Sequence, residues 1–558
     1  MKIINKNRTA LHPVNTSRIL ITLLACATSA QADPILSSWF TQNSSVLARV
    51  IQTTGTSTGT KNTTPVTTWP TAGITNNNNG GLAQTTTVYA DVQRIRYTAS
   101  DVYINSSGLA SYTMGPFLNG NGGLFNFWPV SQNYTVRITR TPSVLAAKTA
   151  HTGGVIGMMV NGVGIYDLGD AFAFVQTGSS PVTGSDTMGQ TNATHPWWRD
   201  ALAVEVVTFD PGFAHQPGIN GQYHYHAEPK ALRYQFGDNM AATYDATNHT
   251  YSYTEDASNL HHSPILGWSF DGYPIYGPYG YSNPTNAASA VTRMRSGFVL
   301  RNAANHAAYG VTDITSTGRT TLAKWAAIAE GLATLANYSS QTLNNGDFVL
   351  VGTPIPASLY GPATNYVNGT TTYSMGRYIG DYDFLGDRGQ TQGSTGTFDL
   401  DQYNGRTCVT PEFPGGTYAY FVTNDASGNP SFPYMLGKQY YGTRNGTAQN
   451  VTIPGTGVTE LFNGGGTSLT ETWSGIPSVN TSTGDVTLTW SSVEGGTYTV
   501  QASDDLNTWT TLSASVSAPA NTVLPAPAKV ITTTTVLDSA AALPANHTRR
   551  FYRVTRNP

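Results

Sequence analysis

The sequence predicts a mainly β protein, in which one large multi-strand β domain with a few helical insertions precedes a small C-terminal β-sandwich. Several segments alternate apolar and polar residues with a period of two, which is typical of strands with one buried face. The 558-residue chain contains 57 glycines and 30 prolines, so turns are frequent and long helices few. Aromatic residues make up 11%, which indicates that most of the chain folds although only 11% of its residues are charged.

The first strand patterns occur before residue 170. Alternation predicts strands over residues 88–97 and 134–139. Residues 155–166 contain two short apolar runs on either side of Asn161-Gly162. This dipeptide favours a type I′ turn, so the segment predicts a β-hairpin.

Three further segments complete the prediction for the large domain. Residues 203–209 are rich in β-branched side chains and predict another strand. Apolar side chains recur at helical spacing from Leu322 to Leu335, which predicts a helix over residues 320–337. Residues 53–81 are rich in Thr, Asn and Gly and predict a poorly ordered stretch.

The C-terminal region has a different strand spacing. A glycine-rich segment predicts a linker at residues 456–474, followed by a separate domain at 475–558. Residues 486–490, 497–503 and 551–554 are evenly spaced strand candidates within it. This spacing and length are typical of a small β-sandwich.

Residues 1–32 are predicted to be a secretory signal peptide. Basic residues precede a short apolar run, which ends at the small-residue site Ala30-Gln31-Ala32. Cleavage near Ala32 would give a secreted, periplasmic or cell-surface protein. A lipoprotein signal at Cys26 is the less favoured alternative. No other segment is apolar enough to predict a transmembrane helix.

Charge and cysteine content exclude several classes of function. The formal net charge is −3 with no basic run after the N-terminus, which argues against nucleic acid as a partner. Only Cys26 and Cys408 occur, so a multi-cysteine zinc site is excluded, and we expect Cys408 to be a buried apolar residue. The standard motifs of serine hydrolases, zinc proteases and nucleotide-binding proteins are absent.

Histidines are concentrated in one part of the chain. Seven of the 11 lie between His195 and His262. His224 and His226 are two positions apart, so on a strand both rings leave the same face. Pro and Gly residues after His215 favour a chain reversal that would bring its ring beside the pair. Three histidines with an open coordination position suit zinc or copper, so the sequence predicts a metal site.

Other interpretations of these residues stay open at this stage. The histidines could satisfy hydrogen bonds within a polar, aromatic strand that binds no metal. Asp271 could hold the second ring nitrogen of a histidine, although Asp271-Gly272 is also typical of a turn, which is the favoured interpretation.

A calcium site is a further candidate between residues 381 and 401. Calcium binds oxygen-rich loops, but the EF-hand spacing is missing, so turn and capping roles are the favoured interpretation. The acidic residues of this segment are Asp381, Asp383, Asp387, Asp399 and Asp401.

Several motifs occur in the order known from one family. Tyr223-His224-Tyr225-His226 matches the motif for which the YHYH domain family is named. Further blocks that resemble this family are residues 161–166, 263–277 and 399–420. The resemblance implies an exported bacterial protein with a YHYH domain, which we expect at residues 39–455. It implies no reaction, because the family is named for its motif.

The C-terminal domain carries a second resemblance. Residues 498–509 and 550–554 resemble the fibronectin-III-like modules at the C-termini of exported bacterial proteins. The resemblance implies a fibronectin-III or immunoglobulin-like sandwich.

These observations lead to one function hypothesis and two alternatives. The first is an envelope protein that binds a metal or another ligand through its histidine cluster, with a small molecule or a cell-envelope component as partner. The alternatives are a mononuclear copper or zinc enzyme and a structural or adhesion protein of the surface. The sequence leaves open whether the protein is an enzyme.

Overall fold

The computed structural model describes most of the chain. It covers residues 3–5, 33–41, 46–51, 84–120, 125, 127–192, 194–218, 220–247, 250–258, 260–330, 338–342, 347–350, 355–446, 451–464, 478–480, 482–493, 497–517, 531–539 and 549–556. The stretch predicted to be poorly ordered, 53–81, lies outside the described residues, as does the predicted signal peptide apart from residues 3–5.

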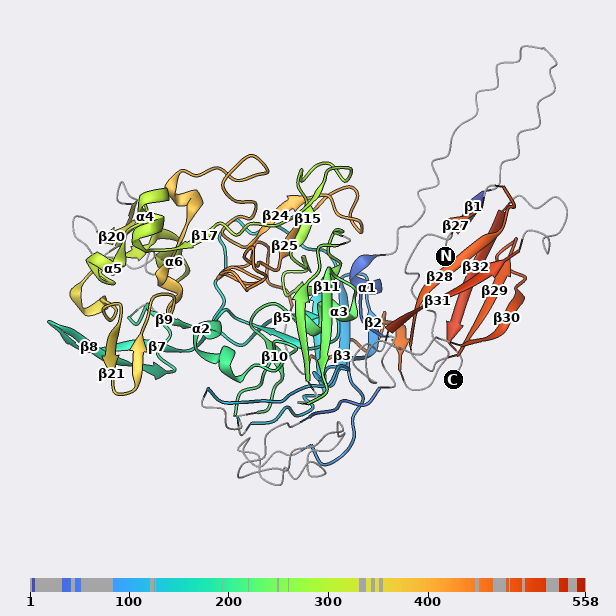
Figure 1. Ribbon diagram of the computed structural model, residues 1–558, viewed down its shortest axis with the longest axis horizontal. Helices are drawn as coiled ribbons and strands as arrows, with labels where there is room; N and C mark the ends of the chain where they lie inside the picture. Colours follow the sequence, from blue (N-terminus) through green and yellow to red (C-terminus); the bar gives the residue numbers. More distant parts are fainter. Residues whose placement is uncertain are drawn as a thin grey trace, which may run out of the picture. The chain divides into compact units, whose positions relative to one another are not determined.

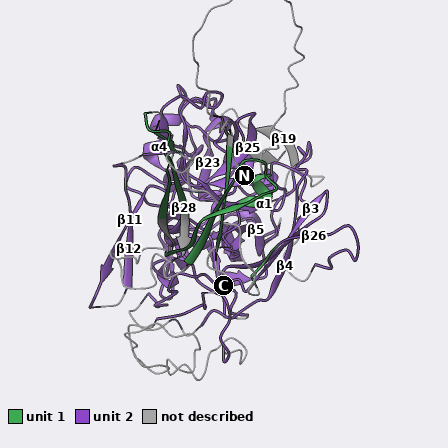
Figure 2. Cartoon of the chain, turned by 90° about the vertical axis from the view of Figure 1, so that its right-hand side faces the viewer, with its two compact units in different colours: residues 1–37, 462–558 green, residues 38–461 purple. Residues whose placement is uncertain are grey.

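The chain divides into two compact units (Figure 2). The larger comprises residues 38–461, and the smaller comprises residues 1–37 together with 462–558. Strands dominate the described residues and the helices are short, so the predicted mainly β fold with a few helical insertions is confirmed (Figure 1). No helix among the described residues is long and apolar enough to span a membrane.

A seven-stranded sheet forms the centre of the larger unit, and one of its edge strands consists of His224 and Tyr225 of the Tyr-His-Tyr-His motif. Its order is β10-β6-β5-β13-β14-β25-β24. The strands are β5 (Val155–Met159), β6 (Gly164–Tyr166), β10 (His224–Tyr225), β13 (Ile265–Ser269), β14 (Pro274–Tyr276), β24 (Gly405–Cys408) and β25 (Thr417–Phe421). The hairpin predicted around Asn161-Gly162 is present as β5 and β6, with Gly162 at a φ of 79° that favours glycine.

Two similar hairpins lie side by side at the middle of this sheet. Residues 157–166 and 267–276 both begin with Gly, have Asn-Gly or Asp-Gly at the turn and end in Ile-Tyr. β5 pairs with β13 antiparallel. Each hairpin then receives a parallel strand on its outer side, β10 on β6 and β25 on β14. The sheet therefore has two related halves that face in opposite directions.

Smaller sheets and short helices surround the central sheet. The sheets are β26-β2-β3-β4 (Thr459–Asn463, Val92–Tyr97, Asp101–Ser106, Tyr134–Thr139), β8-β7-β9 (Val182–Met188, Gly169–Ser179, Trp198–Asp200), β18-β20-β19 (Leu322–Ala323, Asp347–Leu350, Tyr338–Thr342), β11-β12 (Met240–Asp245, Thr250–Glu255), β15-β16 (Tyr279–Tyr281, Val291–Arg293), β17-β23 (Phe298–Leu300, Tyr382–Phe384) and β21-β22 (Tyr366–Asn368, Thr371–Tyr373). The helices are α2 (Ala201–Glu205), α3 (Lys230–Gln235), α4 (Ala303–Tyr309), α5 (Ile314–Thr317) and α6 (Lys324–Ala329).

The strand predicted at residues 203–209 is wrong. The segment forms α2 and a 3-10 turn, Val206–Thr208. The Asp200 side chain accepts the backbone N–H of Ala203 and so caps the helix, and this local signal outweighs the β-branched side chains that follow. Two polar side chains of this segment, Glu205 and Thr208, contact His215 in the site described below.

The helix predicted over residues 320–337 is also shorter than expected. Leu322–Ala323 pair with β20 instead, and α6 occupies only Lys324–Ala329. Trp325 of α6 is buried against Phe298 and Phe432 in a core cluster. Residues 331–337 lie outside the described residues.

The smaller unit contains two sheets that share one core. Their orders are β1-β32-β29-β30 and β27-β28-β31. The elements are β1 (Ile3–Asn5), α1 (Pro34–Ser37), β27 (Ser478–Val479), β28 (Val486–Val493), β29 (Thr497–Ser503), β30 (Thr510–Ser517), β31 (Ile531–Asp538) and β32 (Arg549–Arg556). Trp490, Tyr498 and Val500 are among the buried residues between them. β26 lies within the predicted linker 456–474 and adds to the sheet that contains β2, where Glu460 forms an ion pair with Arg94.

Replacing Trp490 with Ala should destabilise the smaller unit selectively. The Trp490 side chain is fully buried between the two sheets, and loss of a buried Trp costs about 3–5 kcal/mol. In differential scanning calorimetry of the full chain, one transition should move to lower temperature while the other stays. Thr489→Ala, on the half-buried face of the same strand, should leave both transitions in place. Equal shifts of all transitions in the Trp490 variant would contradict the division into units.

Candidate metal centre

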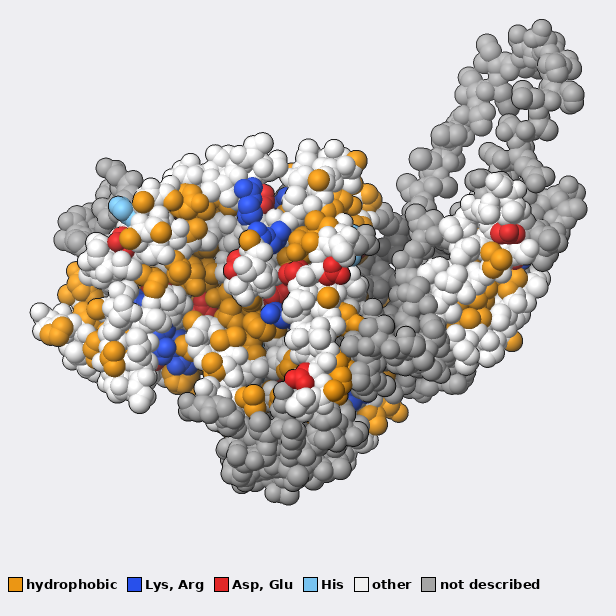
Figure 3. Space-filling model, in the orientation of Figure 1, with side chains coloured by type: hydrophobic (Ala, Val, Ile, Leu, Met, Phe, Trp, Pro, Cys, Tyr) orange, Lys and Arg blue, Asp and Glu red, His pale blue; other side chains and the backbone are white. Residues whose placement is uncertain are grey.

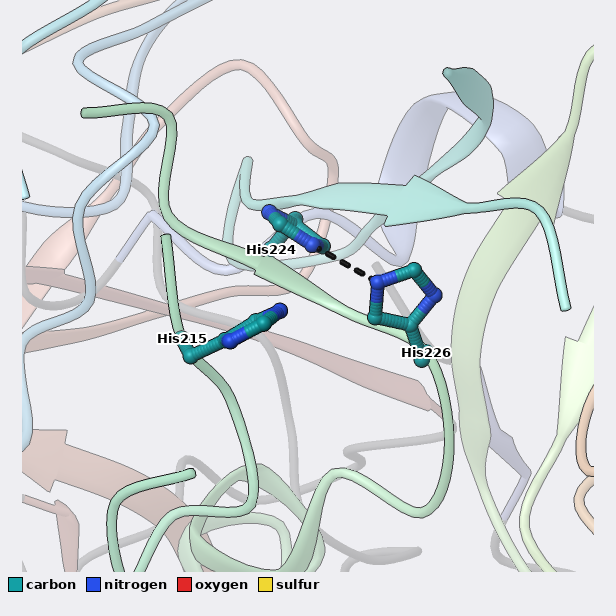
Figure 4. A group of neighbouring side chains, drawn as sticks. All are labelled: His215, His224 and His226. Atoms are coloured by element: carbon teal, nitrogen blue, oxygen red, sulfur yellow. Dashed lines mark hydrogen bonds between the residues drawn. The ribbon is translucent and has the colours of Figure 1, made fainter. Parts of the chain in front are cut away.

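A chain reversal brings His215 beside the Tyr-His-Tyr-His strand. His215 and His224 exchange both backbone hydrogen bonds, at 3.2 and 2.8 Å, as an isolated antiparallel pair. The turn between them closes with a hydrogen bond from the Gly221 N–H to the Pro217 carbonyl, and Gly221 has a φ of 63°. The His224 and His226 rings leave the same face of the chain, so all three rings meet (Figure 4).

The three imidazoles converge in a buried space. One nitrogen from each ring lies within 4.8 Å of the others, and each histidine is at most 4% exposed. The Nε2 atoms of His224 and His226 are 2.9 Å apart. Ligands around one tetrahedral ion at normal Zn–N distances lie about 3.4 Å apart, so this spacing is close to that of a single metal site.

The other nitrogen of each ring is held by an oxygen atom. His224 Nδ1 lies 2.7 Å from the Gln222 carbonyl, and His226 Nδ1 lies 2.8 Å from the Asp167 carbonyl. Carbonyl oxygens can only accept hydrogen bonds, so both Nδ1 atoms must carry a proton.

The Nδ1 atom of the third ring, His215, also faces an acceptor, which is a hydroxyl oxygen. His215 Nδ1 lies 2.7 Å from Thr208 Oγ1. Thr208 donates its own hydroxyl proton to the Glu205 carbonyl at 2.6 Å, so its oxygen accepts from His215. All three Nδ1 atoms are therefore donors, and in the neutral rings all three Nε2 atoms present lone pairs to the same space.

This arrangement favours a cation. Two Nε2 lone pairs at 2.9 Å repel each other unless a proton or a metal ion lies between or beside them. His215 Nε2 has no hydrogen-bond partner among the described residues, although it is buried. A buried nitrogen acceptor without a partner is costly, and a metal ion would satisfy it together with the other two.

Glu205, at the C-terminal end of α2, supplies a carboxylate to the same space. Its Oε2 atom lies 3.1 Å from His226 Nε2 and 3.4 Å from His215 Nε2. Its side chain keeps 26% exposure, so the site is partly open where this carboxylate lies although its histidines are buried. Three imidazoles and one carboxylate form a donor set suited to zinc or copper.

Burial and charge give the rings different proton affinities. Burial lowers the pKa of His224 well below its usual range, and the positive charges of His226 and His215 lower it further. Burial also lowers the pKa of His215. Burial opposes the charge of His226 too, but the hydrogen bond and negative charge of Glu205 outweigh it and raise the pKa of His226. The rings of His215 and His226 hold the pKa of Glu205 well below its usual range despite burial. In the metal-free site, His226 therefore has the highest proton affinity of the three rings.

Aromatic rings enclose the histidines. The Tyr166 ring stacks on His224 with centroids 3.7 Å apart, and its hydroxyl group donates to Gln222, the residue whose carbonyl holds the same histidine. The Phe209 ring lies 4.6 Å from His215 and parallel to His226 at 6.2 Å. These rings pack against the imidazoles and restrict their orientation.

Asp271 does not hold a histidine. Its carboxylate accepts hydrogen bonds from the Tyr420 hydroxyl at 2.7 Å and from the backbone N–H groups of Gly442 and Tyr273. It occupies the turn position of the second hairpin, with Gly272 at a φ of 86°, so its role is in the turn. The partners of the ring nitrogens are Thr208, Gln222 and Asp167 instead.

The aspartates of the 381–401 segment do not gather around a common point. Among the described residues, His215, His224 and His226 form the only group of three or more His, Cys, Asp or Glu side chains with metal-ligand spacing. Each aspartate has its own partner: Asp381 with Arg319, Asp383 with Arg388, Asp387 with Lys324, Asp399 with Arg295, and Asp401 with Tyr418. Cys408, the other residue considered, is buried.

Glu205, Thr208 and Tyr166 were not identified from the sequence. Glu205 and Thr208 lie on the segment that was predicted to be a strand, where their side chains would have pointed differently. The Asp200 N-cap was the signal that could have placed them on a helix and turn. Tyr166 was part of the predicted hairpin, but only the parallel pairing of β10 with β6 brings it to His224.

The tautomer of the site histidines can be tested without a metal. In metal-free protein at about pH 9, His215, His224 and His226 should carry their proton on Nδ1, the rarer neutral form, because each Nδ1 faces an acceptor. Long-range ¹H–¹⁵N correlation spectra of histidine-labelled protein, assigned with single His→Gln variants, report the protonated nitrogen. Nε2-protonated signals from these residues would show that the hydrogen-bond assignment is wrong.

Comparison with known proteins supports the family suggested by the motif. The family described as YHYH protein matches residues 135–433, more than half of the chain, and this range contains the histidine cluster and both central hairpins. No curated protein and no solved structure matches the chain. The chain is therefore a member of the YHYH protein family.

Proposed function

We propose that this protein is exported and binds a single zinc or copper ion through the Nε2 atoms of His215, His224 and His226. One observation carries the proposal: hydrogen bonds to all three Nδ1 atoms leave three Nε2 lone pairs in one buried space. Histidine ligands commonly donate their other ring N–H to a carbonyl or hydroxyl oxygen, which fixes the ring and increases its basicity. Predicted signal-peptide cleavage near Ala32 supports the exported setting.

Glu205 favours a second candidate, catalysis at the bound metal. A metal with three histidine ligands and an open position acts as a Lewis acid and lowers the pKa of a bound water molecule. Glu205 faces His226 and His215 from the partly exposed side of the site. There it could complete the coordination or accept a proton from a water molecule. The metal-binding proposal holds for either role.

The alternative without a metal keeps a proton in the site. A protonated His226 would donate to His224 Nε2 or to Glu205 and leave a purely structural cluster. Such a cluster satisfies two of the rings but leaves His215 Nε2 with only the 3.4 Å contact to Glu205. A metal ion satisfies all three, which is why we favour it.

Metal binding should depend on the triad and on no other buried histidine. Protein purified without chelator should contain about one equivalent of zinc or copper. His224→Ala should weaken binding by more than the about 10–100-fold expected from loss of an outer hydrogen-bond partner, because it removes a ligand. His262→Ala is the matched control, since His262 is also buried with an unpartnered Nε2 but lies outside the triad. Elemental analysis and titration calorimetry give the result. Equal metal content in all three proteins would contradict the proposal.

The affinity for the metal should fall as the pH decreases. Glu205 raises the pKa of His226, so below that pKa a proton occupies His226 and must leave before the metal binds. Titrations between about pH 8 and pH 5 should show weaker binding at the acidic end, with proton release upon binding. Calorimetry in buffers of different ionisation enthalpy measures the released protons. Affinity independent of pH over this range would show that the imidazoles are not the ligands.

A further inference from the structure

A groove of 630 Å³ adjoins the histidine cluster. Its walls come from the loop after β3, from the segment that follows α2, from the start of α3 and from β12. Phe209 belongs to the groove and to the cluster at once, because its ring also contacts His215 and His226. The groove therefore shares one side chain with the proposed metal site.

Flat aromatic side chains dominate this groove. Phe209, Phe213, Tyr251 and Tyr253 line it, and the rings of Tyr251 and Tyr253 are stacked at 6.4 Å. Such rings offer their faces to a flat ligand, either an aromatic ring or the apolar face of a sugar. Charged side chains are few on the face shown in Figure 3, in keeping with the composition, so a charged group in the groove is notable.

Lys230 is the cation of the groove, and its charge acts on the buried carboxylate of Glu228 although the two form no close ion pair among the described residues. Its ammonium group lies 4.6 Å from the centre of the Phe213 ring. Within the described residues no carboxylate lies at ion-pair distance from it, and its side chain makes no hydrogen bond. The Tyr253 hydroxyl group likewise has no hydrogen-bond partner among the described residues. Two donors thus remain available to a ligand.

Asp210, the acid of the groove, is already satisfied by the protein. Its carboxylate accepts hydrogen bonds from the Tyr223 hydroxyl at 2.6 Å and from the backbone N–H groups of Gly115 and Ala214. It is 3% exposed, so these buried donors hold it away from solvent. Its negative charge still acts on Tyr253, so the positive charge offered to a ligand in the groove is that of Lys230.

We propose that this groove binds a small organic acid with a flat ring. The carboxylate would meet the Lys230 ammonium and the Tyr253 hydroxyl, and the ring would pack against the aromatic side chains. Aromatic acids and sugar acids share this chemistry. Binding of the acid in the groove does not require the metal. The Phe209 side chain would separate the acid from the histidines.

The test uses the full-length protein, stripped of metal and dialysed, with two acids and their neutral analogues. The aromatic pair is 4-hydroxybenzoate and 4-hydroxybenzamide, and the sugar pair is galacturonate and methyl galactoside. Lys230→Met removes the charge but keeps the apolar stem, and Lys230→Arg keeps the charge. Lys324→Met is the matched control, because Lys324 already has Asp387 as its partner.

Titration calorimetry should show binding of at least one acid. The neutral analogue should bind the unchanged protein at least about tenfold more weakly than the acid does. The Lys230→Met variant should bind the acid at least about tenfold more weakly than the unchanged protein does, because it loses a charge-assisted hydrogen bond. Lys230→Arg and Lys324→Met should retain binding. The acid that binds identifies the ligand class. No binding of either acid, equal binding of acid and neutral analogue, or full binding by Lys230→Met would each overturn the proposal. Since the protein is metal-free, none of these results depends on the proposed metal site.

Discussion

Two backbone carbonyl groups determine the chemistry of the histidine cluster. The oxygens of Gln222 and Asp167 accept the Nδ1–H groups of His224 and His226, and thereby direct the Nε2 atoms toward each other. The backbone pair between His215 and His224 adds the third ring. If these rings had the opposite tautomer, their lone pairs would face carbonyl oxygens and the cluster could bind no cation. The proposed cation site is therefore a property of the main-chain path as much as of the histidines.

The two related halves of the central sheet differ at the positions of the histidine cluster. β10 pairs with β6 as β25 pairs with β14, so His224, Tyr225 and His226 correspond to Ala419, Tyr420 and Phe421. Both halves have a tyrosine at the middle position, Tyr225 in the first and Tyr420 in the second. In the second half, Asp271 accepts a hydrogen bond from the Tyr420 hydroxyl group. The positions of both histidines are apolar there. The strand pairing thus maintains the architecture, whereas the histidines are specific to one half.

Local patterns predicted the strands better than the site. The hairpin at residues 155–166 and the same-face placement of His224 and His226 follow from turn chemistry and alternation, which act between neighbouring residues. Glu205 could not be found in this way, because a run of β-branched residues hid the helix that Asp200 caps. The role of Asp271 depended on Tyr420 and Gly442, which are distant in the sequence. Long-range pairing decides which neighbours a polar side chain has.

The number of nitrogen lone pairs that must be satisfied, and not charge balance, favours a divalent ion over a proton in this site. Three neutral imidazoles and the Glu205 carboxylate carry a net charge of −1, and a single proton on His226 neutralises it. That proton can serve only one Nε2 pair at a time, so His215 Nε2 keeps only its 3.4 Å contact to Glu205. A divalent metal instead satisfies all three nitrogens and leaves a net charge of +1 beside the partly exposed carboxylate. An anionic ligand or a bound hydroxide would balance that charge, so metal binding would create a preference for anions on the side where Glu205 lies.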